Sequence, residues 1–269
     1  MYQGFNLNLQ RDSKFIQLYF ARGMGIYERQ KRIITNDLNR FKNFTGTLDA
    51  GRIINEWFPE VKAEVFLSHS HKDERLVISL AGWLYKNFGL TSFIDSTVWG
   101  YSKKLQESID KQYCMEPDGH FDYEKCGYSS AHVHMMLSSA LTCMMDKCEC
   151  LFFVNTPRSF TPKKEMQEGR TLSPWIFFEI GTSKVIRRII RRPSNFLFNN
   201  LSEESMDESL DVEYPLDLNH LSEIDITTLQ HWLSTSDMPS CQSLHPLDLL
   251  YILNSRSRGE VEQNGIKLR

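Results

Sequence analysis

Residues 64–94, EVFLSHSHKDERLVISLAGWLYKNFGLTSFI, predict a strand, a helix and a second strand in direct succession. Residues 64–67 form a short, mostly apolar run that favours a strand, and residues 91–94 form another, which ends at Asp95. Between them, residues 73–88 repeat a large apolar side chain at every fourth position, as one face of a helix does. Such alternation of strands and helices indicates a parallel sheet.

The rest of the chain continues this alternation. Residues 151–154 predict a third strand, and residues 15–44 predict one or two helices near the start of the chain. We expect an α/β fold in which a parallel sheet is flanked by helices and ligands bind outside the carboxyl ends of the strands. The other expected elements are helices over residues 103–113, 131–147, 173–192 and 225–233, and a strand over residues 210–216.

Composition sets loose bounds on location and partners. A net charge of -3 and a pI of about 6.3 give the 269-residue chain no overall attraction to nucleic acid or to membrane surfaces. No apolar run approaches the roughly 20 residues of a membrane helix, and the first residues lack the apolar centre of a secretory signal. The six cysteines are irregularly spaced, which favours reduced thiols over a disulfide framework. We expect a cytoplasmic protein.

The run SPWIFFEI, residues 173–180, places one acid in an otherwise apolar helix. Ser173 suits the cap of that helix and Pro174 its first position. Trp175 and Glu179 are four residues apart, so on a helix they share a face, with an aromatic ring beside a carboxylate. The pair is a candidate site. The alternative is a core helix whose single acid reaches solvent or a nearby arginine.

Further candidates lie where the first two strands end. Ser68 and His69 follow the first strand and can hydrogen-bond a nucleotide, although a histidine there can equally be structural. After the second strand we expect an exposed loop over residues 96–104. In it, Trp99 can stack on a base or act as a packing residue, and Lys103 offers charge to a diphosphate.

Four motifs in this order resemble the bacterial Toll/interleukin-1 receptor (TIR) domains: VFLSHSHKDE at residues 65–74, TSFID ending at Asp95, the STVWG that follows, and SPWIFFEI. The resemblance covers about residues 63–233 and implies a flavodoxin-like TIR fold. Members that cleave NAD carry a WxxxE pattern with a catalytic glutamate, which Trp175 and Glu179 match. The resemblance thus implies NAD as substrate, no separate cofactor, Glu179 as the catalytic residue, and an NAD-binding set of Ser68, His69, Asp95, Trp99, Lys103 and Trp175.

The similarity is to stand-alone TIR proteins of anti-phage defence, as in the Thoeris systems. It implies an NAD hydrolase or cyclase that makes an ADP-ribose-type signal for a downstream effector. It also implies self-association through TIR contacts, in which the loop over residues 96–104 completes a neighbour's site. One alternative is a non-enzymatic TIR scaffold that recruits partners. Another is a base or sugar transferase acting on other nucleotides.

Two segments depart from the common TIR pattern. Residues 1–60 predict a helical extension outside the common core, before a TIR domain at residues 61–235. Residues 113–130 are an insertion with a polar, loop-like composition, so we expect it at the surface, where it governs regulation rather than chemistry. Residues 236–269 complete the chain as a C-terminal helix and tail.

A zinc site is a competing interpretation of one segment. Cys114, His120, Cys126, His132 and His134 carry metal-binding side chains within a short stretch. Most of their spacings are wider than those of common structural zinc motifs, so the sequence favours no metal there. Neither a GxGxxG fingerprint nor a GxxxxGK[ST] loop occurs, which disfavours conventional dinucleotide-binding and P-loop sites.

Overall fold

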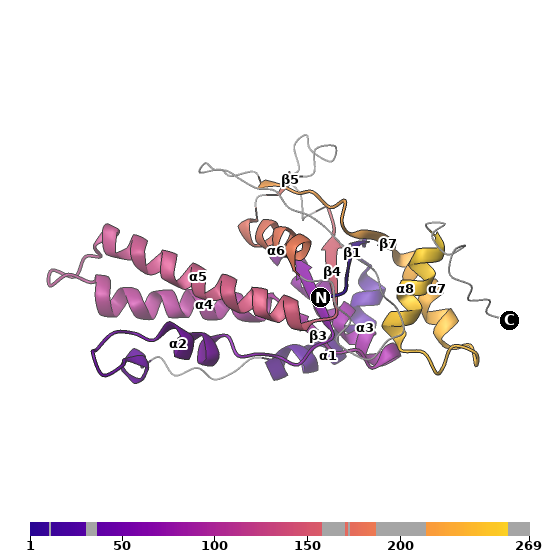
Figure 1. The fold of residues 1–269 in the computed structure, drawn as a ribbon, viewed down its shortest axis with the longest axis horizontal. Coiled ribbons are helices and arrows are strands. Elements are labelled where there is room, and N and C mark those ends of the chain that lie inside the picture. The colour runs from indigo at the N-terminus through magenta and orange to yellow at the C-terminus, as the bar shows by residue number, and fades with distance from the viewer. Residues whose placement is uncertain (11, 31–36, 158–169, 172, 187–213, 258–269) are drawn as a thin grey trace.

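One parallel sheet organises the molecule (Figure 1). The structure is a computed structural model that describes residues 1–10, 12–30, 37–157, 170–171, 173–186 and 214–257. All five strands of the sheet are parallel, which confirms the expected fold class. In spatial order they are β3 (Ser92–Ile94), β2 (Val65–His69), β4 (Cys150–Asn155), β1 (Gln3–Asn8) and β7 (Ser222–Asp225).

Helices cover both faces of this sheet, because its strands are apolar on both sides. Val65 and Leu67 of β2 enter one hydrophobic core, whereas Phe66 between them enters the other. The first core is closed by α1 (Ser13–Gln30), α3 (Glu74–Phe88), α7 (Ile226–Ser236) and α8 (Pro246–Ser257). The second is closed by α2 (Ala50–Trp57), α4 (Ser96–Ile109), α5 (Tyr123–Lys147) and α6 (Pro174–Val185).

The N-terminal segment is part of the sheet, not an extension outside it. Strand β1 lies between β4 and β7, where Phe5 pairs with Phe152 on one side and Ser222 on the other. The expected helical extension over residues 1–60 is thus corrected: a strand precedes its helices. The spatial order of the strands is consistent with a flavodoxin-like sheet, whose strands are ordered 2-1-3-4-5. In that sheet, β1 of this chain takes the place of the fourth strand.

Helix α1 then crosses α3 at close range. A Cβ atom on Gly23 would lie 1.7 Å from the Ile78 carbonyl oxygen, and one on Gly82 would lie 2.4 Å from that of Tyr19. Only glycine allows the two backbones to approach this closely. At the end of α1, the buried Gln30 side chain donates to the Ser92 carbonyl oxygen at 2.5 Å. The N-terminal segment therefore fixes the position of β3.

Helices α4 and α5 form a long antiparallel hairpin that projects from the sheet (Figure 1). Two expectations are corrected here. Residues 96–104 are helical from Ser96 onward, because Val98 and Leu105 are buried against neighbouring helices. Most of the expected insertion loop, residues 113–130, is also helical, because Asp122 caps α5 and starts it early. Only a short turn joins the two helices.

The remaining elements are minor. A two-stranded ribbon pairs β5 (Arg170–Thr171) with β6 (Tyr214–Pro215). Of the expected strand over residues 210–216, residues 210–213 lie outside the described residues, and residues 214–215 form β6. Among the described residues, the strand after α6 that joins the main sheet is β7. Short helical turns are η1 (Leu38–Phe41), η2 (His71–Asp73) and the π-helical η3 (Asp110–Cys114). The predicted continuation of α6 to residue 192 lies outside the described residues. Among the helices described, none combines the length and apolar character needed to cross a bilayer.

Candidate functional site

The carboxyl ends of β2 and β3 meet at one edge of the sheet. Leu67 and Ile94 are register partners in this parallel pair. Ser68 and His69, which end β2, therefore lie beside Asp95, the residue between β3 and α4. All three side chains are fully shielded from solvent. This edge is where α/β folds of this kind place ligands.

His69 and Asp95 form a buried ion pair. The Nδ1 atom of His69 lies 2.6 Å from Oδ1 of Asp95 and 3.4 Å from the Leu67 carbonyl oxygen. Burial alone would lower the pKa of His69, but the charge of Asp95 and its hydrogen bond outweigh burial and raise that pKa above its ordinary value. The His69 ring and the Asp95 carboxyl group thus form one closely coupled pair inside the protein.

Helix α6 brings Glu179 to this pair. The Ser173 hydroxyl accepts from the Ile176 amide at 3.3 Å, and Pro174 occupies the first turn, so the helix begins where the sequence predicts. The helix packs against α5 and β2. Glu179, in its second turn, has no exposed surface.

The Glu179 carboxyl is buried without a hydrogen-bond partner on either oxygen. Burial raises the pKa of Glu179 well above its ordinary value, and the negative charge of Asp95 raises it further. The nearby Ser68 hydroxyl acts in the opposite direction and lowers that pKa. Burial and Asp95 therefore both favour the neutral, protonated form of Glu179.

Several other polar atoms at this edge are also buried without a hydrogen-bond partner. They include Oγ of Ser68, Nε2 of His69 and Nε1 of Trp99. An unsatisfied buried polar group costs about 1–3 kcal/mol, so native proteins keep few of them. Their concentration around Glu179, together with a strongly shifted carboxyl pKa, marks the edge as a candidate site for a polar ligand. We call Ser68, His69, Asp95 and Glu179 the buried acid site.

Trp99 lies over the ion pair from the first turn of α4. Its ring centroid is 5.3 Å from that of His69 and 5.3 Å from that of His71, with tilted planes in both pairs. The ring is half-buried in the second hydrophobic core. Trp99 is therefore part of the site, but it is a packing residue on a helix rather than a side chain in an exposed loop.

Two residues of the expected NAD-binding set, Trp175 and Lys103, have other surroundings in the structure. The Trp175 ring contacts the His134 ring edge-on, with centroids 5.8 Å apart, so it joins α6 to α5. Lys103 follows Trp99 by one turn of α4 at an exposed position. The structure therefore brings together Ser68, His69, Asp95, Trp99 and Glu179, whereas no contact with these residues is shown for Trp175 or Lys103.

One further polar pair at the same edge, Asp73 and Thr156, could not be predicted from the sequence. The hydroxyl of Thr156, just after β4, donates to the Asp73 carboxylate at 2.5 Å, and both side chains are buried. Asp73 belongs to a quoted motif, but its partner is more than 80 residues away in the chain. Only the adjacency of β2 and β4 in the sheet indicates their contact.

Comparisons with known proteins leave the site to be judged on its geometry. No protein-family model matches the chain, and no curated protein or solved structure matches it significantly.

Proposed function

We propose that this protein cleaves the nicotinamide–ribose bond of NAD, with Glu179 as the catalytic carboxylate. The observation that carries the proposal is a fully buried glutamate without a hydrogen-bond partner, beside the His69–Asp95 pair at the carboxyl edge of the sheet. The TIR-like WxxxE pattern supplies the substrate class. The position of Glu179 on the helix after β4 agrees with that pattern.

The chemistry needs one carboxylate. When the bond between ribose carbon 1 and the pyridinium nitrogen breaks, its electron pair goes to the nitrogen and neutral nicotinamide leaves, so no general acid is required, unlike in ordinary glycosidases. The ribose then carries an oxocarbenium-like positive charge. A preorganised carboxylate in a water-poor site stabilises that charge by several kcal/mol. Attack by water gives ADP-ribose and a proton, whereas attack by an adenine nitrogen gives a cyclic product.

The electrostatics of the buried acid site suit this role. Because burial and the charge of Asp95 both raise the pKa of Glu179, the protonation of this carboxyl group responds to a positively charged ligand. A pyridinium, or the ribosyl cation that follows it, lowers the pKa of Glu179 by direct attraction. Binding of NAD therefore ionises the carboxyl where the positive charge develops.

The site is closed to solvent in this structure. Glu179, His69 and Asp95 have no exposed surface, so NAD reaches them only after a covering side chain moves. Trp99 covers His69 from α4 and is half-buried. We assign it the role of the movable cover. Closure over bound NAD then excludes water from the reacting atoms.

The decisive experiment incubates the purified full-length protein with NAD and identifies the products by mass spectrometry. Nicotinamide with ADP-ribose indicates a hydrolase, and nicotinamide with a product one water lighter than ADP-ribose indicates a cyclase. Transfer of the sugar to another base indicates the transferase alternative. If NAD remains intact across protein concentrations and in infected-cell extract, the proposal of NAD cleavage is rejected.

One observation favours a scaffold as the second candidate function. Helix α5 exposes large side chains along its length: Tyr123 is 93% exposed, Tyr128 63% and Met135 70%. Such residues are typical of protein contact surfaces. The same NAD experiment separates the two functions, because a scaffold would self-associate without releasing nicotinamide. The proposed setting for either function is anti-phage signalling, which rests on the TIR resemblance.

A further inference from the structure

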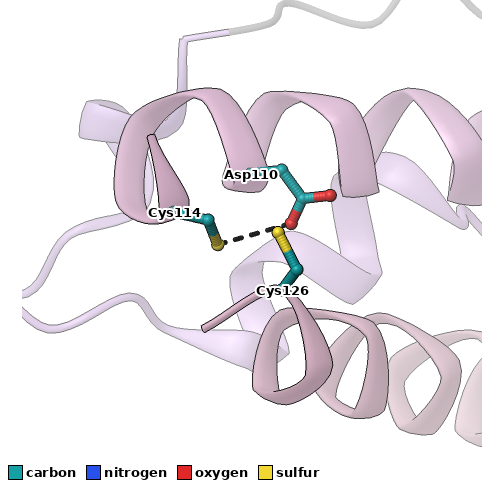
Figure 2. Close-up of side chains that lie close together, drawn as sticks. All are labelled: Asp110, Cys114 and Cys126. Carbon is teal, nitrogen blue, oxygen red and sulfur yellow. Dashed lines mark hydrogen bonds between the residues drawn. The ribbon is translucent and has the colours of Figure 1, made fainter. Parts of the chain in front are cut away.

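A second group of reactive side chains lies at the outer end of the α4–α5 hairpin. Asp110 directly follows α4 and begins the π-helical turn η3, Cys114 ends that turn, and Cys126 lies in the first turn of α5. Their ligand atoms are all within 4.8 Å of one another (Figure 2). Asp110 follows Trp99 by eleven residues, which is about 16 Å along a helix. This hairpin cluster is therefore separate from the buried acid site.

Local structure fixes the three ligand atoms relative to one another. Asp110 and Cys114 are four residues apart, so the helical turn places both on one face. The Asp122 amide donates to the Cys114 carbonyl oxygen at 2.8 Å, which closes the turn between the helices. Asp122 also caps α5 and accepts from the Cys126 amide at 2.9 Å through its own carbonyl oxygen. The turn thus holds Cys126 opposite Cys114.

The distances fit a tetrahedral metal ion. The Cys114 sulfur lies 3.5 Å from Oδ1 of Asp110. A thiolate and a carboxylate oxygen bound to one zinc ion, at 2.3 Å and 2.0 Å, are about 3.5 Å apart at the tetrahedral angle. By the same geometry, two zinc-bound sulfurs are about 3.8 Å apart. This separation is compatible with the ligand atoms of the cluster, which all lie within 4.8 Å of one another.

Neighbouring side chains orient the Asp110 carboxylate. Nε2 of Gln106 lies 2.9 Å and 3.0 Å from its two oxygens, and the Ser129 hydroxyl donates to Oδ1 at 2.5 Å. Gln106 also donates to Ser129 at 2.6 Å, so the two supports are joined. Metal sites commonly have such an outer shell, which fixes the direction of a ligating carboxylate. Nothing in the chemistry proposed for NAD uses these residues.

We propose that Asp110, Cys114 and Cys126 bind a zinc ion that ties the end of α4 to the start of α5. Two thiolates select a soft ion, and zinc takes thiolate and carboxylate together in four-coordinate sites. The fourth position faces the half-exposed side of Asp110 and Cys126 and takes water. Binding releases the two thiol protons and changes no oxidation state. The sequence alone favoured no metal in this segment. The proposed site keeps Cys114 and Cys126 from the residues considered there, adds Asp110 as the third ligand and needs no histidine.

The test titrates the full-length, reduced, metal-free protein with Co²⁺ as an optical probe and with Zn²⁺ as its competitor. We expect thiolate-to-cobalt charge-transfer absorption and the visible bands of a four-coordinate ion, which Zn²⁺ removes at about one equivalent per chain. Cys126→Ser should reduce the charge-transfer intensity by roughly half or abolish it. Gln106→Ala keeps all three ligands and should lower zinc affinity about 10- to 100-fold.

The matched control is Cys143→Ser, an exposed cysteine on the same helix α5, which should leave the titration unchanged. Circular dichroism checks that each variant is folded, and Gln106→Ala gives a readout even where loss of a cysteine disturbs the hairpin. Absence of charge-transfer absorption in the reduced protein overturns the proposal. So does charge-transfer absorption that is undiminished in Cys126→Ser, or a Cys114–Cys126 disulfide that forms in air in a protein that binds neither ion.

Discussion

The buried acid site and the hairpin cluster each present a carboxyl group on a helix, but they treat it in opposite ways. Glu179 is fully buried and neither of its oxygens has a hydrogen-bond partner. Asp110 is half-buried and both of its oxygens accept from Gln106 or Ser129. A buried acid without hydrogen-bond partners destabilises the fold and responds strongly to an arriving positive charge. The Asp110 carboxylate, whose oxygens accept hydrogen bonds from its neighbours, is already oriented to bind a metal ion.

The contrast separates a reacting site from a static one. In the first, the missing interactions are left for a substrate whose charge changes during reaction. In the hairpin cluster, the hydrogen bonds that orient the ligating carboxylate are already formed before an ion binds. Four predicted effects test this contrast, from the largest to the smallest.

The largest effect is expected from Glu179→Gln. The variant keeps the size and the helix but loses the charge that stabilises the ribosyl cation, so NAD turnover should fall by a factor of about a hundred to a thousand. Binding of NAD should weaken much less. The measurement is the initial rate of nicotinamide release, with NAD affinity measured separately.

Glu107→Gln is the matched control, because Glu107 is an exposed glutamate on α4. It should retain full turnover. A Glu179→Gln protein with the turnover of the Glu107→Gln protein would remove the carboxylate from the mechanism and leave Glu179 as a core residue.

The positions of most strands and helices could be predicted, because their apolar spacing is strong. Strand β1 could not: its sequence QGFNLN combines glycine and two asparagines, which disfavour strands in isolation. It becomes a strand because β4 and β7 pair with it on both sides. The start of α4 was missed for a related reason, since Asp95 and Ser96 have the composition of a turn but enter a helix directly.

The members of the buried acid site could be predicted from motifs, but their electrostatics could not. The motifs indicate that Ser68, Asp95 and Glu179 belong to one site, whereas only the packed structure shows that both Glu179 oxygens are buried without a hydrogen-bond partner. Helical spacing put Trp175 on the face of Glu179, yet only the structure shows its contact with His134 of α5. Asp110 escaped notice because a single aspartate four residues before a cysteine is common in helices.

The second largest effect is expected from Gly23→Ala, which tests whether the N-terminal helix supports the buried acid site. The new Cβ would meet the Ile78 backbone, which cannot rotate away, so the helices must separate. We expect a loss of about 1–3 kcal/mol in the free energy of unfolding. Because Gln30 of α1 holds β3, NAD turnover should fall too, whereas Co²⁺ binding at the hairpin cluster should persist.

Gly25→Ala provides the control on the same helix, since a Cβ there has no atom within 4 Å. It should stabilise the protein by about 0.5–1 kcal/mol through its higher helix propensity. Chemical denaturation of the two variants measures the difference. Equal stabilities would mean that α1 and α3 do not pack as described.

A third effect is expected in the pH dependence of stability, and it uses Glu179→Gln again. Because the folded-state pKa of Glu179 is raised, the folded protein holds a proton that the unfolded chain loses above its ordinary pKa. Glu179 therefore destabilises the fold increasingly as pH rises from about 4.3 towards its folded pKa. The glutamine variant should match the parent near pH 4 and become the more stable protein at neutral pH.

Thermal midpoints across this pH range provide the measurement. Excess NAD should narrow the difference at neutral pH, because the bound cation favours the ionised carboxyl. A glutamine variant that is less stable than the parent at neutral pH would show that Glu179 has a structural partner, and the contrast with Asp110 would then disappear.

The smallest effect is expected from Ser173→Ala, which removes the cap of the helix that carries Glu179. The lost hydrogen bond to the Ile176 amide should cost about 1 kcal/mol, near the middle of the range for such caps. Ser108→Ala on α4 is the control, because that hydroxyl donates back to the Lys104 carbonyl oxygen within the helix, and its removal should cost little. If α6 positions Glu179, fraying of its first turn should lower NAD turnover severalfold while Co²⁺ binding at the hairpin cluster stays unchanged. A Ser173→Ala protein that loses cobalt binding as well would show that the two regions are coupled through α5, on which α6 packs.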